Sequence, residues 1–313
     1  MPDYAIGLDL GGTNLRAAAI DFTGKMLDSI AGSTKFSEGR EAVLADMVTA
    51  INKLREKHGG LGLAGIGVGV PGFIRMKEGF ITSSNNLPYL ENFPIRDELQ
   101  RLLGTRFILE NDANAAALGE KWMGAGRDTD DLVMLTLGTG IGGGIISGGR
   151  VIRGFVGMGG ELGHVTVVPN GNPCGCGNMG CLEKHASATA VVAMANMMHL
   201  GGELNAGDLT SRRVYEIARG TDDMAERARS VWRTVGECLG IALATLINTF
   251  NFPLYLLSGG MLPAWEFFEP AMMATVKQRS YTFRATQTRI AQAALGNEAG
   301  LYGAAYLPWI EKE

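Results

Sequence analysis

Short apolar runs, separated by glycine-rich turns, alternate with longer amphipathic segments along most of the chain. Apolar runs of about four to eight residues that end at turn residues predict buried strands. These runs are Tyr4–Leu10, Leu15–Asp21, Met26–Ile30, Ala64–Val70, Arg106–Glu110, Leu132–Leu137, Gly142–Ile146, Leu254–Ser258 and Ile290–Ala294, with a hairpin over Phe73–Ile81. Apolar residues that recur with a helical period predict helices over Arg40–His58, Ile95–Leu103, Ala113–Glu120, Lys184–Met198, Ser211–Arg219, Asp222–Phe250, Ala264–Arg279 and Ala299–Ile310. This alternation predicts an α/β fold.

One combination, a strand, a glycine turn with threonine and a second strand, occurs twice, at Ile6–Asn14 and at Met134–Gly142. The interval is about 130 residues, which favours a duplicated domain over a solenoid of short repeats. A chain of 313 residues is long enough for two such domains. The sequence therefore predicts two lobes with similar cores.

Charge is nearly balanced, because 28 basic and 32 acidic residues give a formal net charge of −4. No basic stripe in the sequence indicates a nucleic-acid partner. No apolar run reaches the roughly 18 residues that a membrane-spanning helix needs, and the first residues do not resemble a signal peptide. We therefore expect a soluble cytoplasmic protein without a nucleic-acid or membrane partner.

A histidine and three cysteines follow one another at close spacing, His164-x9-Cys174-x-Cys176-x4-Cys181. Glycines between the cysteines allow the chain to fold back, so that several side chains converge on one centre. One imidazole and three thiolates form a ligand set of tetrahedral Zn²⁺. Four protein ligands leave no open position, which indicates a structural rather than a catalytic metal.

Two other interpretations of the cysteines are weaker. A disulfide between Cys174 and Cys176 would be strained at that spacing. Burial as small apolar residues does not suit the pattern Cys-Gly-Cys-Gly. The fourth cysteine, Cys238, lies on the apolar side of its predicted helix with Val235 and Leu239, so we expect it in the core.

Three glycine-containing turns follow predicted strands, at Gly11-Gly12-Thr13, Gly138-Thr139-Gly140 and Gly259-Gly260. Backbone N–H groups in such turns can bind anions. The P-loop pattern does not occur in the sequence. Gly138–Gly143 and Gly67–Gly72 both match the dinucleotide fingerprint G-x-G-x-x-G, but the residues after each look extended rather than helical, which argues against a dinucleotide site.

Two aspartates stand where strands meet turns. Asp9 ends an apolar strand, a costly place for a carboxylate that has neither a cation nor a donor. Beside a phosphate turn its expected partner is Mg²⁺, with a structural bond to the following turn as the alternative. Asp112 is expected to be the N-cap of a helix. It also follows Glu110 and Asn111 at the carboxyl end of a strand, where α/β sheets bind ligands and a carboxylate can act as a general base.

Taken together, these motifs resemble the ROK family of sugar kinases and repressors, within the actin-like ATPase superfamily. The blocks that carry the resemblance are Asp9-x-Gly-Gly-Thr-Asn14, Pro71-Gly72, Asn111-Asp112-Ala-Asn-Ala, Leu137-Gly-Thr-Gly140, Gly160-Glu-Leu-Gly-His164, Cys174-Gly-Cys-Gly-x-x-Gly-Cys-Leu-Glu183 and Gly303-Ala-Ala. They cover nearly the whole chain. The blocks around Glu161, His164 and Glu183 are specific to the family, whereas the glycine turns indicate only the superfamily.

The resemblance implies an α/β fold with two similar actin-like, or ribonuclease H-like, lobes and a ligand cleft between them. The small N-terminal lobe would comprise residues 1–116 and about 298–313. The large lobe, residues 117–297, would carry the nucleotide site and the zinc knuckle, which is the segment from His164 to Cys181. ATP, Mg²⁺ bound with the nucleotide, structural Zn²⁺ and a hexose are the implied ligands.

Matching the family's motifs residue by residue implies four roles: general base, sugar binding, nucleotide binding and metal binding. Asp112 would be the base that takes the proton of the attacking sugar hydroxyl. The sugar-binding positions would be Asn86, Asn111, Asp112, Glu161, His164 and Glu183. The nucleotide-binding positions would be Asp9, Gly11, Gly12, Thr13, Asn14, Gly138, Thr139, Gly140, Gly259 and Gly260. The metal ligands would be His164, Cys174, Cys176 and Cys181, so that one imidazole would serve both Zn²⁺ and sugar.

The expected activity is ATP-dependent phosphorylation of a hexose at its 6-hydroxyl, most like the family's glucokinases, which form glucose 6-phosphate. Kinases of fructose, mannose, N-acetylmannosamine and N-acetylglucosamine share the core motifs and stay open as alternatives, as does polyphosphate as the donor. The other alternative is a sugar-sensing regulator. Repressors of the family carry a DNA-binding segment before the first glycine turn, which begins here at Gly11, so we expect an enzyme. The resemblance also favours a homodimer.

Overall fold

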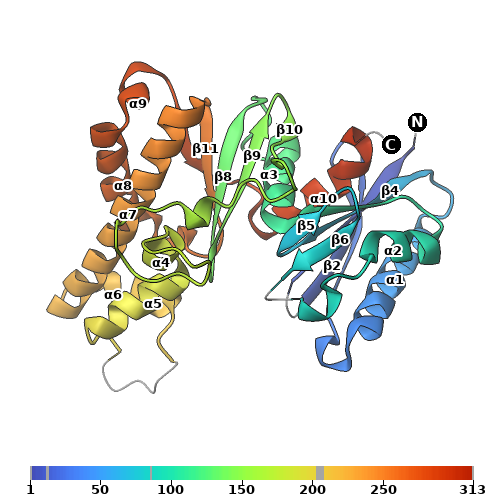
Figure 1. Cartoon of the computed structure of the whole chain (residues 1–313), viewed down its shortest axis with the longest axis horizontal. Helices are drawn as coiled ribbons and strands as arrows, with labels where there is room; N and C mark the ends of the chain where they lie inside the picture. Colours follow the sequence, from blue (N-terminus) through green and yellow to red (C-terminus); the bar gives the residue numbers. More distant parts are fainter. Residues whose placement is uncertain (1, 12–13, 85–86, 202–207, 312–313) are drawn as a thin grey trace. The chain divides into compact units, whose positions relative to one another are not determined.

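The structure is a computed structural model that describes residues 2–11, 14–84, 87–201 and 208–311 (Figure 1). Contacts between residues divide the chain into two compact units. The first unit comprises residues 1–131, 144–160 and 293–313, and the second comprises residues 132–143 and 161–292.

The first unit is built on a five-stranded sheet with the order β3-β2-β1-β4-β7. Strand β1 is antiparallel to β2 and parallel to β4, which is in turn parallel to β7. A two-stranded hairpin, β5-β6, lies outside this sheet. The elements of this unit are β1 (Tyr4–Leu10), β2 (Asn14–Asp21), β3 (Met26–Ser33), α1 (Arg40–Lys57), β4 (Leu63–Val70), β5 (Phe73–Arg75), β6 (Phe80–Ser83), α2 (Ile95–Leu103), β7 (Phe107–Asn111), α3 (Asp112–Met123), β10 (Arg150–Val151) and α10 (Ala299–Ile310).

A second five-stranded sheet has the order β10-β9-β8-β11-β12. The order matches that of the first sheet strand by strand. In each sheet the first three strands in chain order lie in reverse, as β3-β2-β1 and β10-β9-β8, and the two later strands follow on the other side of the first. Strands β8, β11 and β12 are parallel, as β1, β4 and β7 are. The duplication expected from the glycine turns is therefore confirmed at the level of topology. The elements are β8 (Leu132–Leu137), β9 (Ile141–Ser147), α4 (Glu183–Ala186), α5 (Ala188–Met197), α6 (Ser211–Ala218), α7 (Asp223–Phe250), β11 (Leu254–Ser258), α8 (Trp265–Arg279), α9 (Tyr281–Ala285) and β12 (Arg289–Gln292).

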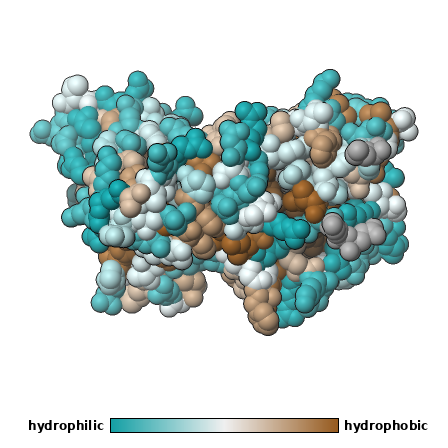
Figure 2. Space-filling view, turned by 90° about the horizontal axis from the view of Figure 1, so that it is seen from above, coloured by the Kyte–Doolittle hydropathy of each residue, from teal (hydrophilic) through white to brown (hydrophobic). Residues whose placement is uncertain are grey.

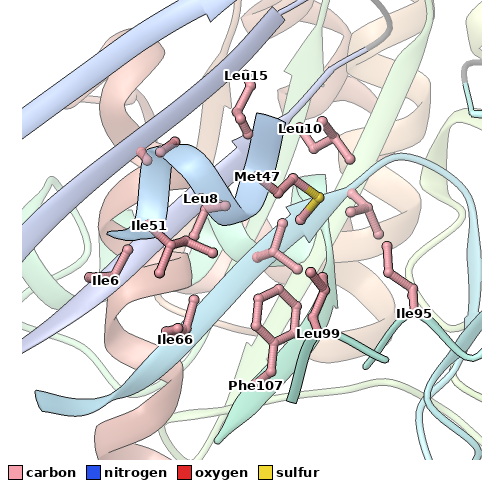
Figure 3. Close-up of a cluster of buried hydrophobic side chains, with 14 of the residues drawn as sticks. Ile6, Leu8, Leu10, Leu15, Met47, Ile51, Ile66, Ile95, Leu99 and Phe107 are labelled. Carbon is pink, nitrogen blue, oxygen red and sulfur yellow. The ribbon is translucent and has the colours of Figure 1, made fainter. Parts of the chain in front are cut away.

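Alternate residues of β1 point to opposite faces of the first sheet, as the period of a strand requires. Ile6, Leu8 and Leu10 face helices α1 and α2 and pack in one cluster with Met47 and Phe107 (Figure 3). These side chains are fully or almost fully buried. Burial of each large apolar side chain stabilises the fold by about 1.5–3 kcal/mol, so this cluster anchors the sheet.

The other face of the sheet is covered by α10, which also packs closely on α3. Glycines make the approach possible: a Cβ atom on Gly7 would collide with the α10 backbone, and one on Gly303 would collide with the backbone of α3. The packing of α3 on α10 groups residues 117–131 with the first unit. This contact grouping keeps α3 in one unit, whereas the expected lobe boundary at residue 116 would divide the helix; that boundary stays a prediction.

Two local expectations are wrong at the ends of helices. The expected helix Lys184–Met198 is two helices, α4 and α5, because Ser187 is extended and its side chain accepts a hydrogen bond from Ala190 N at 3.1 Å as the N-cap of α5. Helix α3 is capped by Asn111, whose Oδ1 accepts from Ala113 N and Asn114 N at 3.0 and 3.2 Å. Asp112, expected as the cap, is the first helical residue.

Helix α7 is, among the described residues, the one helix whose length and hydropathy would allow it to cross a membrane. Its apolar window is 67% buried in the protein, which is the environment of a core helix. Cys238 lies on this helix and is buried, as expected. The face of the molecule in Figure 2 carries mainly hydrophilic side chains interrupted by small hydrophobic patches.

Candidate active site

The four expected metal ligands converge. Ligand atoms of His164, Cys174, Cys176 and Cys181 all lie within 4.8 Å of one another. Cys174 Sγ lies 3.5 Å from His164 Nδ1, and Cys176 Sγ lies 3.7 Å from Cys181 Sγ. Tetrahedral Zn²⁺ with ordinary bond lengths would place sulfur and nitrogen about 3.6 Å apart and two sulfurs about 3.8 Å apart. The donor set and its spacing therefore fit a closed zinc site.

His164, one of the four candidate metal ligands, ends a short turn, Leu162–His164, and Glu161 directly precedes this turn. His164 turns Nδ1 toward Cys174, and its Nε2 lies 3.9 Å from Glu161 Oε2. Both side chains are partly exposed, at 31% and 43%. The imidazole can thus bind a metal through one nitrogen and leave the other beside a carboxylate that solvent can reach.

Glu183 follows the last cysteine by two residues and contacts the glycine turn after β8. Its Oε2 accepts a hydrogen bond from Ile141 N at 3.1 Å, and Gly140 packs against the same carboxylate. The turn is also held from α5, because Ala188 N donates to Gly138 O and Thr189 Oγ1 donates to Thr139 O at 2.7 Å. The expected sugar residue Glu183 and the expected phosphate turn are therefore in direct contact.

Gly259-Gly260 lies beside the same turn. The strands before the two turns, β11 and β8, are parallel neighbours, so their carboxyl ends meet at one edge of the sheet. Gly259 has φ +104°, which favours glycine, and a Cβ atom there would collide with Leu137. A cavity of about 370 Å³ opens next to Gly260. Its other lining residues are Ser211, Arg212, Tyr215, Trp232, Met261, Pro263 and Ala264.

In the first unit, Asp9 forms an ion pair with Arg16, which stands opposite it in the β1–β2 hairpin. The Arg16 guanidinium binds Asp9 Oδ2, so the partner is an internal cation and not the following turn. Asp9, Gly11, Asn14 and Arg16 line a cavity of about 640 Å³ together with Ala31, Gly32, Ser33 and Asn297. The cavity places the Arg16 guanidinium near Gly11, and an arginine beside backbone N–H groups can bind a phosphate.

Asp112 stands at the start of α3, and its side chain is exposed to solvent. Many protein atoms nevertheless surround it, and this desolvation raises the pKa of Asp112. The N–H of Ala113, 2.9 Å from Asp112 Oδ1, acts in the opposite direction, and the charge of Asp9 raises the pKa further. A reachable carboxylate with a raised pKa is suited to accept a proton.

Three expected site residues, Gly12, Thr13 and Asn86, lie outside the described residues. Of the others, Asp9, Gly11, Asn14, Asn111 and Asp112 belong to the first unit. The second unit contains Gly138, Thr139, Gly140, Glu161, His164, Cys174, Cys176, Cys181, Glu183, Gly259 and Gly260.

Several residues that complete these sites were not predicted from the sequence. Arg16 could have been found from the register of the first hairpin, since a short turn places it opposite Asp9. Thr189, Arg212 and Tyr215 gave no signal, because they reach the glycine turns from helices far along the chain. Arg153, which binds Glu110, is likewise 43 residues away from its partner.

The duplicated sheet and the turns at its strand ends define an actin-like ATPase fold. A model of the ROK family matches residues 5–310, and the chain belongs to this family. The structure is similar to a ROK hexokinase from Thermus thermophilus, with 35% identity, 96% of each chain covered and a TM-score of 0.85. It is also similar to a ROK family glucokinase from Streptomyces griseus in complex with glucose and AMPPNP, with 31% identity, 97% and 98% covered and a TM-score of 0.79.

Curated relatives of both functional kinds match the chain. A glucokinase from Halalkalibacterium halodurans is 35% identical, with 97% of this chain and 94% of the relative covered. A glucokinase from Thermotoga maritima is 37% identical, with 96% and 95% covered. A xylose repressor from Caldicellulosiruptor bescii is 30% identical, and the match covers 95% of this chain but 76% of the repressor. These relatives support a sugar-kinase function within a family that also contains regulators.

Proposed function

We propose that the protein is an ATP-dependent hexokinase that phosphorylates the 6-hydroxyl of a hexose, with glucose as the favoured substrate, in the cytoplasm. The observation that carries the proposal is the Asp112 carboxylate at the start of α3, reachable by solvent and with a raised pKa. The glucokinase relatives and the neighbour bound to glucose and AMPPNP support the choice of substrates.

In this proposal Asp112 accepts the proton of the sugar hydroxyl as the oxygen attacks the terminal phosphoryl group, and ADP leaves. A general base of this kind contributes about 10²–10⁴-fold to the rate. The rest of the catalysis is positioning and charge stabilisation, because phosphoryl transfer requires little covalent chemistry from the protein. Asn86, Asn111, Glu161, His164 and Glu183 would bind and orient the sugar.

The nucleotide would be held by the backbone N–H groups of Gly138–Gly140 and Gly11–Asn14, with Gly259-Gly260 and the adjacent cavity on the adenosine side. Tyr215 and Arg212 supply an aromatic ring and a cation to that cavity. Asp9 would bind nucleotide-bound Mg²⁺ through water, using Oδ1, since Arg16 occupies Oδ2. Mg²⁺ supplies neutralisation of the phosphate charge when bound.

The zinc cluster would have a positioning function. His164, Cys174, Cys176 and Cys181 would hold Zn²⁺, and the bound metal would fix the backbone on both sides of the cysteines, so that Glu161, His164 and Glu183 could face one ligand. Because the same segment holds Gly138–Gly140 through Glu183 and Thr189, the metal would also stabilise the phosphate turn.

The test is a coupled assay of ADP release across glucose, fructose, mannose, N-acetylmannosamine and N-acetylglucosamine. A parallel assay measures sugar phosphate formed with polyphosphate as the donor. Turnover that is fastest with glucose and ATP supports the proposal, and a higher kcat/KM for another sugar would reassign the substrate. Sugar binding without turnover from either donor would favour a regulator. Light scattering with and without sugar tests the expected homodimer.

A further inference from the structure

Glu110 is a buried carboxylate next to the proposed base, and the proposed reaction does not use it. Its side chain is 1% exposed. Alternate residues of β7 face opposite sides of the sheet, so Phe107 and Leu109 join the core beneath α2 while Glu110 points toward α3. A carboxylate at such a position is costly unless cations and donors compensate its charge.

Among the described residues, three hydrogen bonds and an ion pair compensate this charge. Glu110 Oε1 accepts from Asn111 N at 2.9 Å and from Asn114 Nδ2 at 3.1 Å. Glu110 Oε2 accepts from Arg153 Nε at 2.7 Å, and Arg153 Nη2 lies at the same distance from it. Burial raises the pKa of Glu110 in spite of this cation. The ionised carboxylate therefore depends on Arg153.

Arg153 is held in turn by a second acid. Its Nη2 lies 2.5 Å from Glu311 Oε1, at the end of α10. Burial opposes the charge of Arg153, but the carboxylates of Glu110 and Glu311 outweigh it and raise the pKa of the guanidinium. The Arg153 side chain is partly buried, at 23% exposed, and it ties the end of β7 to the segment after β10 and to the C-terminal helix.

The bonds to Glu110 fall on both sides of Asp112. Asn111 donates its N–H to Glu110 and caps α3 with its side chain, and Asn114 donates its amide to the same oxygen. Asp112 lies between these two anchored residues at the start of the helix. A small rotation of the first turn of α3 would move the Asp112 carboxylate, and a misplacement of about 1 Å can cost about a hundredfold in rate.

We infer that Glu110 and Arg153 are a positioning pair for the general base: they fix the first turn of α3 so that the Asp112 carboxylate points at the sugar hydroxyl. This inference rests on the proposed kinase function. Neither residue touches substrate in this role. A positioning role differs from a purely structural role in one testable respect. Without the pair, turnover should fall even in protein that is fully folded and still binds sugar.

The experiment compares Arg153→Met, the double variant Glu110→Gln/Arg153→Met and the control Glu311→Gln. The control removes the negative charge of Glu311, the second carboxylate that Arg153 contacts. For each variant we would measure kcat, the KM of the sugar, the sugar Kd by calorimetry without nucleotide, and Tm, with kinetics at least about 20 °C below Tm. Arg153→Lys, which keeps the charge but loses the planar pair of donors, is the conservative rescue.

We expect kcat of Arg153→Met to fall about tenfold to a hundredfold while sugar Kd stays within about twofold of wild type. The kcat of Arg153→Lys should lie between those of the wild type and Arg153→Met. Glu311→Gln should keep wild-type kcat. The double variant should recover Tm, because it leaves no unpaired buried charge, without recovering kcat. If Arg153→Met does not fold, the double variant decides the question.

Wild-type kcat in a folded variant without Arg153 would overturn the inference and leave the pair with a structural role only. Equal loss of sugar binding and turnover would overturn it too, because the whole site would then have collapsed. An inactive wild-type protein would refute the proposed kinase function instead, so the two failures are distinguishable.

Discussion

The contact between Gly140 and Glu183 allows a sharp test of the sugar site with a single methyl group. A Cβ atom on Gly140 would overlap Glu183 Oε2, whereas a Cβ atom on Gly138 would find its nearest neighbour, Gly140 O, at 3.9 Å. Neither glycine has a φ in the left-handed region. Gly140→Ala therefore displaces the Glu183 carboxylate, and Gly138→Ala in the same turn is its matched control.

The displacement breaks the hydrogen bond of 3.1 Å from Ile141 N to Glu183 Oε2 and moves the carboxylate away from the position proposed for sugar binding. A hydrogen bond to a charged group contributes about 1.5–3 kcal/mol. If the sugar loses one such bond, its affinity falls about tenfold to a hundredfold, since every 1.4 kcal/mol corresponds to about a tenfold change. The fold itself should be little affected, because Glu183 is a partly exposed, flexible side chain.

The assay is calorimetric titration of glucose into each variant without nucleotide, so that changes in the phosphate turn itself do not contribute. We expect the glucose Kd of Gly140→Ala to rise about tenfold to a hundredfold. The Kd of Gly138→Ala should stay within about twofold of wild type. Unchanged glucose affinity in Gly140→Ala would show that Glu183 does not bind the sugar. An equal loss in both variants would show that the turn, rather than the carboxylate, is responsible.

Three further perturbations test other parts of the molecule. Asp112→Asn should retain sugar affinity and the α3 cap at Asn111 but lower kcat by about 10²–10⁴-fold. In the wild type, kcat should fall as the pH decreases through the raised pKa of Asp112, because the base must be ionised to accept a proton. This fall should occur at a higher pH than for an ordinary aspartate. A profile of kcat against pH that shows no such fall would exclude Asp112 as the base. Cys176→Ser should lose bound zinc, measured by elemental analysis, and should bind both sugar and nucleotide more weakly. Its control, Cys238→Ala, should keep the metal. A wild-type protein purified without zinc would contradict the metal site. Phe107→Ala should lower the free energy of unfolding, measured by denaturant titration, by about 3–5 kcal/mol, because Phe107 is only 1% exposed. Leu102, which lies on α2, is half-exposed, and Leu102→Ala should change the free energy of unfolding by less than about 0.5 kcal/mol.

The sequence alone determined the features that depend on residues close together in the chain. The strands and most helices follow from short-range periodicity, and the duplicated topology follows from two similar turns. The four candidate zinc ligands lie within 18 residues, from His164 to Cys181, so their spacing was sufficient to predict that they converge. The family motifs are also local blocks, so they indicate the family without any knowledge of tertiary contacts.

Local helix ends were less predictable. Asn111 and Asp112 are both good N-caps, and in the structure Asn111 caps the helix while its own N–H donates to Glu110. The break at Ser187 was also hidden, because serine is tolerated in a helix and the residues on either side have helical character. In both cases neighbouring interactions decided between backbone states of similar intrinsic free energy.

Only the tertiary structure decided which distant groups meet. Arg153 reaches Glu110 across 43 residues and Glu311 across 158, and Thr189 reaches Thr139 across 50. The cost of burying Glu110 predicts that it needs a partner, but sequence spacing does not say which cation supplies it. That choice depends on how sheets and helices pack, and packing is fixed by the whole core rather than by any single segment. The sequence determined the chemical groups of the site, and the tertiary structure decided how the groups around Asp112 are held in place.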